Sequence, residues 1–299
     1  MRRERLVIVG AGPAGVAAAV QAARLGVRPA LIDREGVCGG LVRNAWRMEN
    51  YPGLAEPIPG PAFASLLARH LRNFGLAVEP GEVRAVRRAG ADFVLALGAG
   101  ELIAEAVVLA VGTSPKRLNV PGMVDLGGRL CYEVREALLL QPKRAIVVGG
   151  GEAGVDYALS LADAGAAVDL LLRGERLRAR GRLLEAAQNR AEIRFRRRCE
   201  LRGFRRDASG MEAEIVENGQ PGVLRADAVV VAVGRLSAAA ELLPDLAYSP
   251  GDSLATKWTG LFVVGDARAD FLGQAAIAVG DGLRAAQLVV DFLERRDAS

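Results

Sequence analysis

A short apolar run followed at once by a glycine-rich turn is the feature that most constrains how this chain can fold. Residues 6–9 read Leu-Val-Ile-Val, and the next six read Gly-Ala-Gly-Pro-Ala-Gly. A β-branched run without polar positions is typical of a strand buried on both faces of a parallel sheet. Gly10 permits the tight turn, Gly12 lets backbone N–H groups approach a pyrophosphate, and Gly15 lets the next helix pack on the strand. The spacing predicts a helix over 16–25 whose N-terminus faces the phosphates.

A second strand and an acid extend this pattern. The run from Arg28 to Ile32 ends in Asp33, which stands 18 residues after Gly15. A carboxylate at the end of the second strand is placed to bind a ribose hydroxyl. Strand, glycines, helix, second strand and acid fall in register, and together they predict a dinucleotide-binding site.

The same pattern returns in the middle of the chain. A short apolar strand over 145–148 is followed by a second glycine turn, Gly149-Gly-Gly-Glu-Ala-Gly154. A helix is expected over 155–164 and a second strand over 167–172. Two copies of one mononucleotide-binding pattern indicate two nucleotide-binding domains.

The residues after this second strand bear on the choice of nucleotide. An acid at the strand end binds the ribose 2′-hydroxyl of NAD, whereas arginines accommodate the 2′-phosphate of NADP. Glu175 lies past the strand end, between Arg173 and Arg178. The sequence therefore favours NADPH and leaves NADH open. The alternative is that both arginines are solvated surface side chains.

Composition excludes several other classes of protein. The 299 residues suffice for two domains, and no apolar run approaches the roughly 20 residues that a membrane span needs. The net charge of +4 is scattered and aromatic residues are few, so we expect no nucleic-acid partner. Cys38, Cys131 and Cys199 have neither disulfide-framework nor metal-ligand spacing. The first strand begins so early that we expect no signal peptide and a cytoplasmic location.

The remaining stretches predict shorter elements. A helix is expected over 63–74, antiparallel strands over 76–78, 82–87 and 93–97, buried strands over 106–111 and 228–233, a strand over 260–266 and a helix over 274–293. The two buried strands run into Gly112 and Gly234. Ligands of open α/β sheets bind at the carboxyl ends of strands, so we expect Asp266 to touch a nucleotide. We also expect the last segment to return to the first domain.

Together these motifs resemble the low-molecular-weight thioredoxin reductase group of flavoproteins over essentially the whole chain. The matching residues are Gly10 to Gly15, Gly39-Gly40, Glu49 to Gly53, Gly112-Thr113, Val120 to Gly122, Gly149 to Gly154, Gly265-Asp266 and Gln274 to Ala276. The resemblance implies an α/β fold with two doubly wound, Rossmann-like domains. The FAD domain would comprise 1–114 and 243–299, with an NAD(P)H domain, 115–242, inserted into it and linked near 113–116 and 240–246. It also implies a homodimer and a large rotation of one domain against the other.

The resemblance also implies which residues hold the cofactors. Those expected to bind FAD are Gly10, Gly12, Pro13, Ala14, Gly15, Asp33, Arg34, Gly40, Leu41, Asn50, Val83, Gly112, Gly265, Asp266, Gln274 and Ala275. Those expected to bind NAD(P)H are Gly149, Gly151, Glu152, Ala153, Gly154, Arg173, Arg178 and Gly234. Gly174 stands where the group usually keeps a second arginine for the 2′-phosphate, which weakens the preference for NADP.

The chain departs from the group at its redox cysteines. The group carries a Cys-x-x-Cys pair just before the second glycine turn, but here Val134 stands three residues after Cys131. Dithiol–disulfide exchange needs an attacking thiolate and a second thiol that resolves the mixed disulfide. Reduction of thioredoxin by that mechanism is therefore not expected. Cys131 is the one candidate for a thiol role, and the competing interpretation is a small buried residue.

A further departure lies in the segment that the group places by its flavin. Leu41 and Trp46 replace small polar residues there, and aromatic rings stack well on planar rings. We expect Trp46, or Tyr132 from the segment that lacks the cysteine pair, near the isoalloxazine. Packing in a core or interface is the alternative for both. The single histidine, His70, lies away from both glycine turns and is not expected to be catalytic.

The sequence thus predicts an NAD(P)H-dependent FAD oxidoreductase with an electron acceptor outside the chain. Three alternatives stay open: an electron transferase similar to the thioredoxin-reductase-type ferredoxin–NADP reductases, an FAD-binding sensor or assembly protein without turnover, and a thiol-dependent enzyme that uses Cys131 with a cysteine of its partner. The acceptor could be a small redox protein docked on the arginine-rich stretch 194–206, which otherwise is a solvated face. No metal site is expected.

Overall fold

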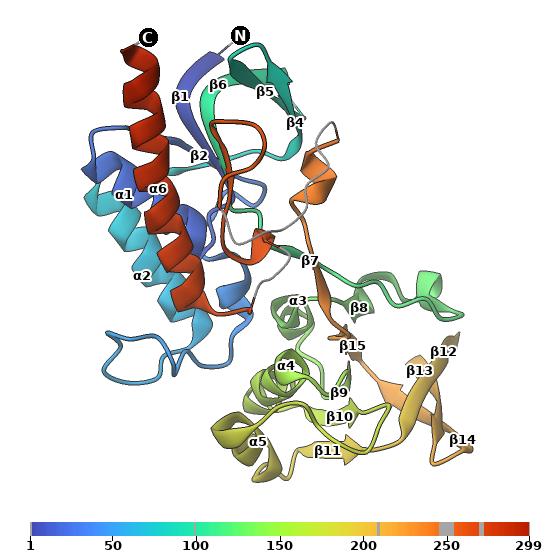
Figure 1. Ribbon diagram of the computed structural model, residues 1–299. Coiled ribbons are helices and arrows are strands. Elements are labelled where there is room, and N and C mark those ends of the chain that lie inside the picture. The colour runs from blue at the N-terminus through green and yellow to red at the C-terminus, as the bar shows by residue number, and fades with distance from the viewer. Residues whose placement is uncertain (1, 99, 208–209, 245–253, 269–271, 299) are drawn as a thin grey trace. The chain divides into compact units, whose positions relative to one another are not determined.

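The chain folds into two compact units. The computed structural model describes residues 2–98, 100–207, 210–244, 254–268 and 272–298. Unit 1 comprises Met1–Arg43, Arg47–Ser114 and Leu236–Ser299, and unit 2 comprises Asn44–Trp46 and Pro115–Arg235. The ribbon in Figure 1 follows the chain from the N-terminus to the C-terminus, both of which lie in unit 1.

A seven-stranded sheet forms the centre of unit 1. Its strands are β1 (Arg2–Val9), β2 (Ala30–Asp33), β3 (Val78–Pro80), β4 (Val83–Ala89), β5 (Asp92–Leu97), β6 (Gly100–Leu109) and β17 (Leu261–Val263). They lie in the order β3-β2-β1-β6-β5-β4, and β17 pairs with the later part of β6. Strands β3, β2, β1, β6 and β17 are parallel, whereas β5 and β4 continue the sheet antiparallel.

The edge strand β3 corrects one expectation. The sequence assigned the strand over 76–78 to the antiparallel piece, but β3 pairs in parallel with β2 through Leu31–Val78 and Asp33–Pro80. The short run of β-forming residues did not distinguish these two partners, because pairing depends on where the preceding helix returns the chain.

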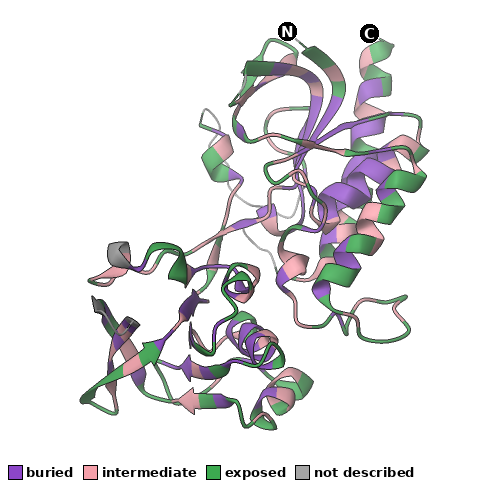
Figure 2. Cartoon of the chain, turned by 180° about the vertical axis from the view of Figure 1, so that it is seen from behind, coloured by how far each residue is buried: buried purple, intermediate pink, exposed green. Residues whose placement is uncertain are grey.

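The helices of unit 1 lie together on one side of this sheet. They are α1 (Pro13–Arg24), α2 (Gly60–Asn73) and α6 (Ala275–Asp297). Unit 1 also has three short 3₁₀ turns, η1 (Gly40–Asn44), η3 (Ala240–Leu242) and η4 (Gly265–Ala267). In β1, Leu6 and Ile8 pack with α1 and α6, whereas Val7 and Val9 pack with β4, β5 and β17. The expected strand buried on both faces is confirmed, and Figure 2 shows the buried strands of this sheet.

Helix α6 packs closely on α1. A Cβ on Gly282 would lie 2.1 Å from the carbonyl oxygen of Ala14, so only a glycine lets the two backbones approach this closely. The last helix of the chain therefore packs against the first turns of α1.

The second crossing between the units differs from the expected boundary. The chain passes from unit 2 to unit 1 at Arg235–Leu236, whereas the sequence places this boundary at 242/243, in a linker near 240–246. Residues 236–242 therefore belong to unit 1 and not to unit 2. Ala239 and Leu243 are buried in the unit 1 cluster with β4 and β17, and this burial explains the difference. The two crossing strands, β7 (Thr113–Pro115) and β16 (Arg235–Ser237), pair with each other. Part of the predicted last segment, 245–253 and 269–271, lies outside the described residues.

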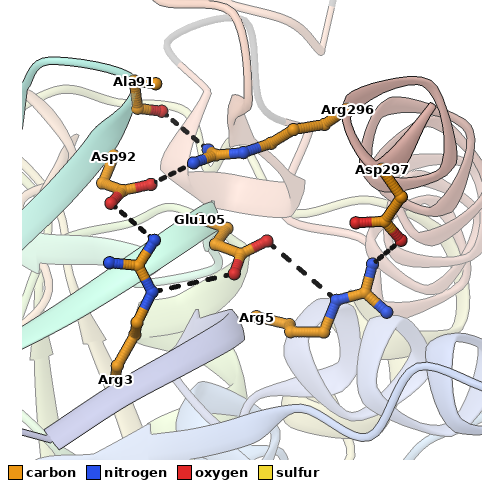
Figure 3. A network of polar contacts seen from close by, with 7 residues as sticks. All are labelled: Arg3, Arg5, Ala91, Asp92, Glu105, Arg296 and Asp297. Atoms are coloured by element: carbon orange, nitrogen blue, oxygen red, sulfur yellow. Dashed lines mark hydrogen bonds and ion pairs between the residues drawn. The ribbon is translucent and has the colours of Figure 1, made fainter. Parts of the chain in front are cut away.

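A network of ion pairs ties α6 to the beginning of the sheet (Figure 3). Arg3 pairs with Asp92 at 2.8 Å, and Arg296 at the end of α6 pairs with the other oxygen of Asp92 and donates to the carbonyl of Ala91. Arg5 pairs with Asp297, and both N-terminal arginines approach Glu105. Backbone pairing with β6 extends β1 back to Arg2, four residues before the apolar run that the sequence singled out.

Asp92→Asn is expected to lower the free energy of unfolding of unit 1 by about 1–2 kcal/mol, because two guanidinium groups would then face an amide. Burial by itself raises the pKa of Asp92, but the hydrogen bond and charge of Arg296, together with Arg3, lower this pKa overall. The folded-state pKa is thus below the unfolded value. The stabilisation is full above about pH 4 and is lost as the pH falls through the lowered pKa.

Urea unfolding of the two proteins at pH 7 and at pH 3 measures this effect. Asp291→Asn is the matched control, since among the described residues Asp291 accepts a side-chain hydrogen bond from Gln287 alone, on the same helix. The Asp92 difference should shrink at pH 3. An equal loss at both pH values would show that the carboxylate charge does not matter.

Unit 2 repeats the strand order of unit 1 on a smaller scale. Its parallel sheet has the order β11-β10-β9-β15-β8 and consists of β8 (Leu130–Cys131), β9 (Arg144–Val148), β10 (Ala167–Leu171), β11 (Ile193–Arg196) and β15 (Ala228–Val231). The other elements are η2 (Met123–Arg129), α3 (Val134–Leu139), α4 (Glu152–Asp163), α5 (Gly181–Gln188) and the antiparallel strands β12 (Cys199–Asp207), β13 (Gly210–Glu217) and β14 (Gln220–Ala226).

Alternate residues of β9 build the two cores of unit 2. Ala145 and Val147 pack with the helices, and Ile146 packs with the three-stranded sheet β12-β13-β14. The sheet is therefore covered by helices on one face and by strands on the other. The expected α/β fold with two Rossmann-like domains is confirmed.

Candidate functional site

The first glycine turn connects β1 to α1. Gly10 has a φ of +101°, and a Cβ there would lie 2.3 Å from the carbonyl oxygen of Ala110 in the chain that follows β6. Its N–H donates to the carbonyl of Ile32 at 2.7 Å. The turn is thus fixed between the carboxyl ends of β2 and β6, where ligands of open α/β sheets bind.

The N-terminus of α1 is bare. Gly12 is its N-cap residue, none of the described side chains caps the helix, and a Cβ on Gly12 would meet no described atom within 4 Å. A Cβ on Gly15 would by contrast lie 1.8 Å from the carbonyl oxygen of Gly10. The free N–H groups and the positive end of the helix dipole therefore face open space, which suits a pyrophosphate.

The Asp33 carboxylate braces this turn as well as ending β2. One oxygen accepts the Ala11 N–H at 2.9 Å and the other accepts the Glu35 N–H at 2.9 Å. A carboxylate has about four acceptor positions, so a ribose hydroxyl could still be accommodated. The sequence singled out Asp33 for ribose binding but did not predict its role in the turn.

The loop at Gly39-Gly40 lies against the same turn. The N–H of Gly39 donates to the carbonyl of Ala11 at 2.8 Å, and a Cβ on Gly40 would lie 3.3 Å from the Cα of Gly12. Leu41 follows in η1 and is partly exposed. The structure thus brings the expected flavin-binding loop to the first glycine turn.

The C-terminal segment reaches this turn as well. A Cβ on Gly265 would lie 2.9 Å from the Cβ of Ala14, and the Gly265 N–H donates to Asp281 at 3.1 Å. Asn50 donates to the side-chain oxygen of Gln274, the N-cap residue of α6, at 2.6 Å. Asp281 is a member of this cluster that sequence reasoning missed, and an acid four residues from Ile277 in an amphipathic helix gives no signal of it.

The other expected FAD residues take various places in unit 1. Pro13 and Ala275 begin helices α1 and α6, and Asp266 lies in η4. Arg34 is exposed just after β2, whereas Val83 is buried at the start of β4. The carbonyl of Gly112 accepts the Ala238 N–H. Since the side chain of Val83 packs in the core, only its backbone could contact a ligand.

The second glycine turn in unit 2 has the same geometry. Gly149 has a φ of +129°, its N–H donates to the Leu171 carbonyl at 3.1 Å, and a Cβ there would lie 2.2 Å from the carbonyl oxygen of Ala232. A Cβ on Gly154 would lie 1.9 Å from the carbonyl oxygen of Gly149. Gly151 is the uncapped N-cap residue of α4. Glu152 and Ala153 are exposed in its first turn, and Gly234 follows β15.

Arg178 lies directly at this second turn. Its backbone N–H donates to the carbonyl of Gly150 at 2.8 Å, and its guanidinium lies 3.7 Å from where a Cβ on Gly151 would be. Arg173 is exposed at the end of β10, and Glu175 is paired with Arg198. A phosphate at the helix N-terminus would therefore meet arginine, while the nearby acid is neutralised by its own partner. Both glycine turns fit a dinucleotide.

The candidate thiol and the two aromatic residues have partners inside unit 2. Cys131 is 2% exposed in β8, and burial, followed by the charge of Glu136, raises the pKa of its thiol to about 11. Tyr132 is buried with β12 and β13, accepts the Leu118 N–H, and is stacked by Arg117 at 4.5 Å. Trp46 packs against the helical core of unit 2. These contacts favour packing roles.

The arginine-rich stretch is largely neutralised by neighbouring carboxylates. Arg196 pairs with Asp169 and Glu217, and three other pairs are Arg198–Glu175, Arg202–Glu200 and Arg205–Glu214. An acidic partner would have to displace these carboxylates, and docking on this face stays a prediction.

The described ranges contain neither a metal-binding cluster nor a membrane-spanning helix. No three or more His, Cys, Asp or Glu side chains in them are grouped so as to hold a metal ion. No helix in them is long and apolar enough to cross a membrane.

Comparisons with known proteins agree with this geometry. A family model described as "Pyridine nucleotide-disulphide oxidoreductase" matches residues 4–282. A thioredoxin reductase of Bacillus subtilis is 30% identical, over 97% of this chain and 94% of that protein. The crystal structure of Lactococcus lactis thioredoxin reductase, titled "FR conformation", has a TM-score of 0.89 at 29% identity and covers 98% of this chain and 99% of that one. The crystal structure of T. acidophilum thioredoxin reductase has a TM-score of 0.85 at 26% identity and covers 97% of this chain and 99% of that one.

Proposed function

The chain belongs to the pyridine nucleotide-disulphide oxidoreductase family and is an NAD(P)H-dependent flavoprotein oxidoreductase with FAD and NADPH as its cofactors, and on this premise we propose that it reduces an acceptor other than thioredoxin. We assign FAD to the first glycine turn and NADPH to the second. FAD held at the first turn would supply the redox chemistry that connects the nicotinamide to a separate acceptor.

The residues of unit 1 would hold FAD by its phosphates and ribose. The bare N-terminus of α1 at Gly12 supplies N–H groups for the pyrophosphate, and Asp33 supplies an acceptor for a ribose hydroxyl. The Gly39-Gly40 loop, Asn50 with Gln274, and Gly265 would line the same cofactor.

The residues of unit 2 would hold NADPH in the same way. The N-terminus of α4 at Gly151 faces the pyrophosphate, and Arg178 supplies positive charge beside it. An exposed Arg173 with the neutralised Glu175 leaves a 2′-phosphate without a repelling acid. These features support NADPH over NADH.

One observation carries the proposal that the acceptor is not thioredoxin. The three cysteines are Cys38, Cys131 and Cys199, all with free thiols, and Val134 stands where a resolving cysteine would be. Burial raises the pKa of Cys131 to about 11, so its thiol is neutral at physiological pH. Without a thiolate and a second thiol, dithiol exchange has neither of its two steps. A homodimer remains a prediction.

Anaerobic stopped-flow mixing tests this function. NADPH is expected to bleach the flavin absorbance of the yellow protein fully, and NADH is expected to do so at least about tenfold more slowly, since it lacks the 2′-phosphate that arginine binds. Steady-state turnover with NADPH and oxidised thioredoxin should stay at background, and Cys131→Ser should reduce the flavin as fast as the unchanged protein.

Two outcomes would contradict the proposal. Absence of bleaching by either nucleotide, with FAD still bound, would mean that unit 2 does not deliver hydride. Thioredoxin turnover that disappears in Cys131→Ser would instead assign a thiol role to Cys131.

A further inference from the structure

A pocket of about 510 Å³ lies in unit 1 between α2 and the loop that follows β2. We call it the α2 pocket. Residues 36–38 line it on the loop side, and residues 76–78, which lead into β3, line another side. All its described lining residues belong to unit 1, and none of them is a residue that we assign to FAD. The α2 pocket is therefore distinct from the site at the first glycine turn.

Short side chains on one face of α2 create this space. Four of them line the pocket at the three- and four-residue spacing of neighbours on a helix: Pro61, Ala64, Ser65 and Ala68. The Ser65 hydroxyl donates to the carbonyl of Pro61 at 3.0 Å, so its hydrogen is already bonded. Leu71 on the same helix is buried in the core with α1. The core thus fixes the position of α2, while its short side chains leave room for a ligand.

The charged side chains of the α2 pocket are of one sign. Among its described lining residues, the charged ones are Arg43 and Arg72, and apolar side chains such as Leu76 and Val78 form much of the rest. Arg43 pairs with Glu35 at 2.6 Å. No described carboxylate pairs with the guanidinium of Arg72, which is exposed near the end of α2. The pocket therefore combines apolar walls with one uncommitted cation.

Cys38 places a thiol in the loop wall of the α2 pocket. Its side chain is half-buried against the core of unit 1. Burial, followed by the charge of Asp33, raises the pKa of this thiol, and the charge of Arg72 opposes the shift. Cys38 and Arg72 thus line one pocket from two elements, within electrostatic reach of each other. A ligand that occupies the pocket would cover the thiol, so alkylation of Cys38 can measure occupancy.

This lining defines the chemistry of an occupant. Ligand pockets of a few hundred Å³ are mainly apolar and orient the ligand with a small number of polar groups. An apolar body is stabilised when it leaves water for such walls. A carboxylate matches the planar fork of an unpaired guanidinium, whereas a cation would be repelled by both arginines. A neutral molecule would leave Arg72 without a partner. An anion with an apolar body uses both features.

We propose that the α2 pocket is a binding site for a small carboxylate whose charge pairs with Arg72 and whose apolar body lies against the short side chains of α2. The site uses neither glycine turn, so it does not depend on the electron transfer proposed above. The loop that lines it continues into Gly39, whose N–H donates to the carbonyl of Ala11 in the first glycine turn. The occupant therefore contacts the loop that we assign to FAD.

Calorimetric titration of the FAD-bound protein with octanoate tests the site, with octanol as the neutral probe of the same chain length. Octanoate should bind with a Kd below about 1 mM. Arg72→Gln should weaken octanoate at least about fivefold and leave octanol unchanged, because it removes the guanidinium. Arg69→Gln is the matched control, since Arg69 is exposed on the same helix and is not among the described lining residues. It should leave both affinities unchanged.

Alkylation of Cys38 by iodoacetamide, followed by mass spectrometry, is the second readout. Octanoate at about ten times its Kd leaves roughly a tenth of the sites free, so it should slow this alkylation roughly tenfold. Ala68→Phe fills the pocket and should make the alkylation rate independent of octanoate. Cys131 and Cys199, each 2% exposed, should stay unmodified throughout, which shows that the variants are folded.

Three results would overturn the proposal. The first is octanoate binding weaker than about 1 mM in the unchanged protein. The second is equal octanoate affinity in Arg72→Gln and Arg69→Gln. The third is octanoate binding that leaves the alkylation of Cys38 unchanged, because the carboxylate would then lie elsewhere on the protein.

Discussion

The Gly12→Glu protein is expected to fold and to lack FAD. Gly12 has φ and ψ of −71° and −177°, which any residue adopts, and a Cβ there meets nothing within 4 Å. A glutamate therefore fits without strain, but it places a carboxylate at the bare N-terminus of α1 where we assign the pyrophosphate. Two like charges about 4 Å apart repel by about 4 kcal/mol at an effective dielectric constant near 20, which corresponds to roughly a 10³-fold loss of affinity.

Flavin content after purification, and titration of the apoprotein with FAD, measure this effect. Gly12→Ala is the comparison, since it adds the same Cβ without a charge. Its methyl group takes up part of the space in which the N–H groups approach the pyrophosphate, so it should bind FAD more weakly than the parent but more tightly than Gly12→Glu. The thermal midpoint of Gly12→Glu should match that of the flavin-free parent, because bound FAD itself stabilises the fold. A stoichiometrically yellow Gly12→Glu protein would exclude the first glycine turn as the flavin site.

Both glycine turns were predictable from the sequence because their chemistry is local. Gly10 and Gly149 each need a positive φ and each approach a neighbouring strand end more closely than a Cβ allows. These requirements leave a fixed spacing of glycines after an apolar strand, which can be read without knowing the rest of the fold. The burial of β1 and β9 on both faces follows in the same way from runs without polar positions.

The contacts that the sequence did not reveal depend on partners far along the chain. Asp156 and Asp163 accept hydrogen bonds from Trp46, but they lie on a helix whose polar face looks like any solvated surface. The second crossing at Arg235–Leu236 is set by the burial of Ala239 against the unit 1 sheet, and no turn signal marks it. Side-chain burial between distant elements carries no periodicity that a single sequence displays.

Residues of one cofactor site that lie far apart in the sequence are brought together only by the fold. Asn50 and Gln274 both appeared as expected FAD residues, yet only the fold brings their side chains to 2.6 Å of each other. Gly282 and Asp281, which bring α6 and η4 to the first turn, carried no signal. A motif thus identifies the part of a cofactor site made by one loop, and the parts supplied by other segments emerge from packing.

The corresponding substitution at the second glycine turn, Gly151→Glu, is expected to impair NADPH binding while FAD stays bound. Gly151→Glu should yield a yellow protein that NADPH no longer bleaches, although dithionite still does. Gly151 has φ and ψ of −83° and 178°, so the backbone accepts a side chain, and the guanidinium of Arg178 is the nearest group to its Cβ position, at 3.7 Å. The new carboxylate would pair with Arg178 and occupy the N-terminus of α4, which removes both the positive charge and the space that we assign to NADPH.

Stopped-flow absorbance at a fixed NADPH concentration measures the effect, and the rate of flavin reduction should fall by roughly 10³-fold. Gly151→Ala adds a methyl group without a charge, so its rate should fall by much less than that of Gly151→Glu. Flavin content equal to that of the parent shows that unit 1 is intact, so a slow reduction is then due to the nucleotide site alone. Bleaching of Gly151→Glu at the parent rate would mean that NADPH binds elsewhere, and the assignment of the second turn to the electron donor would be wrong.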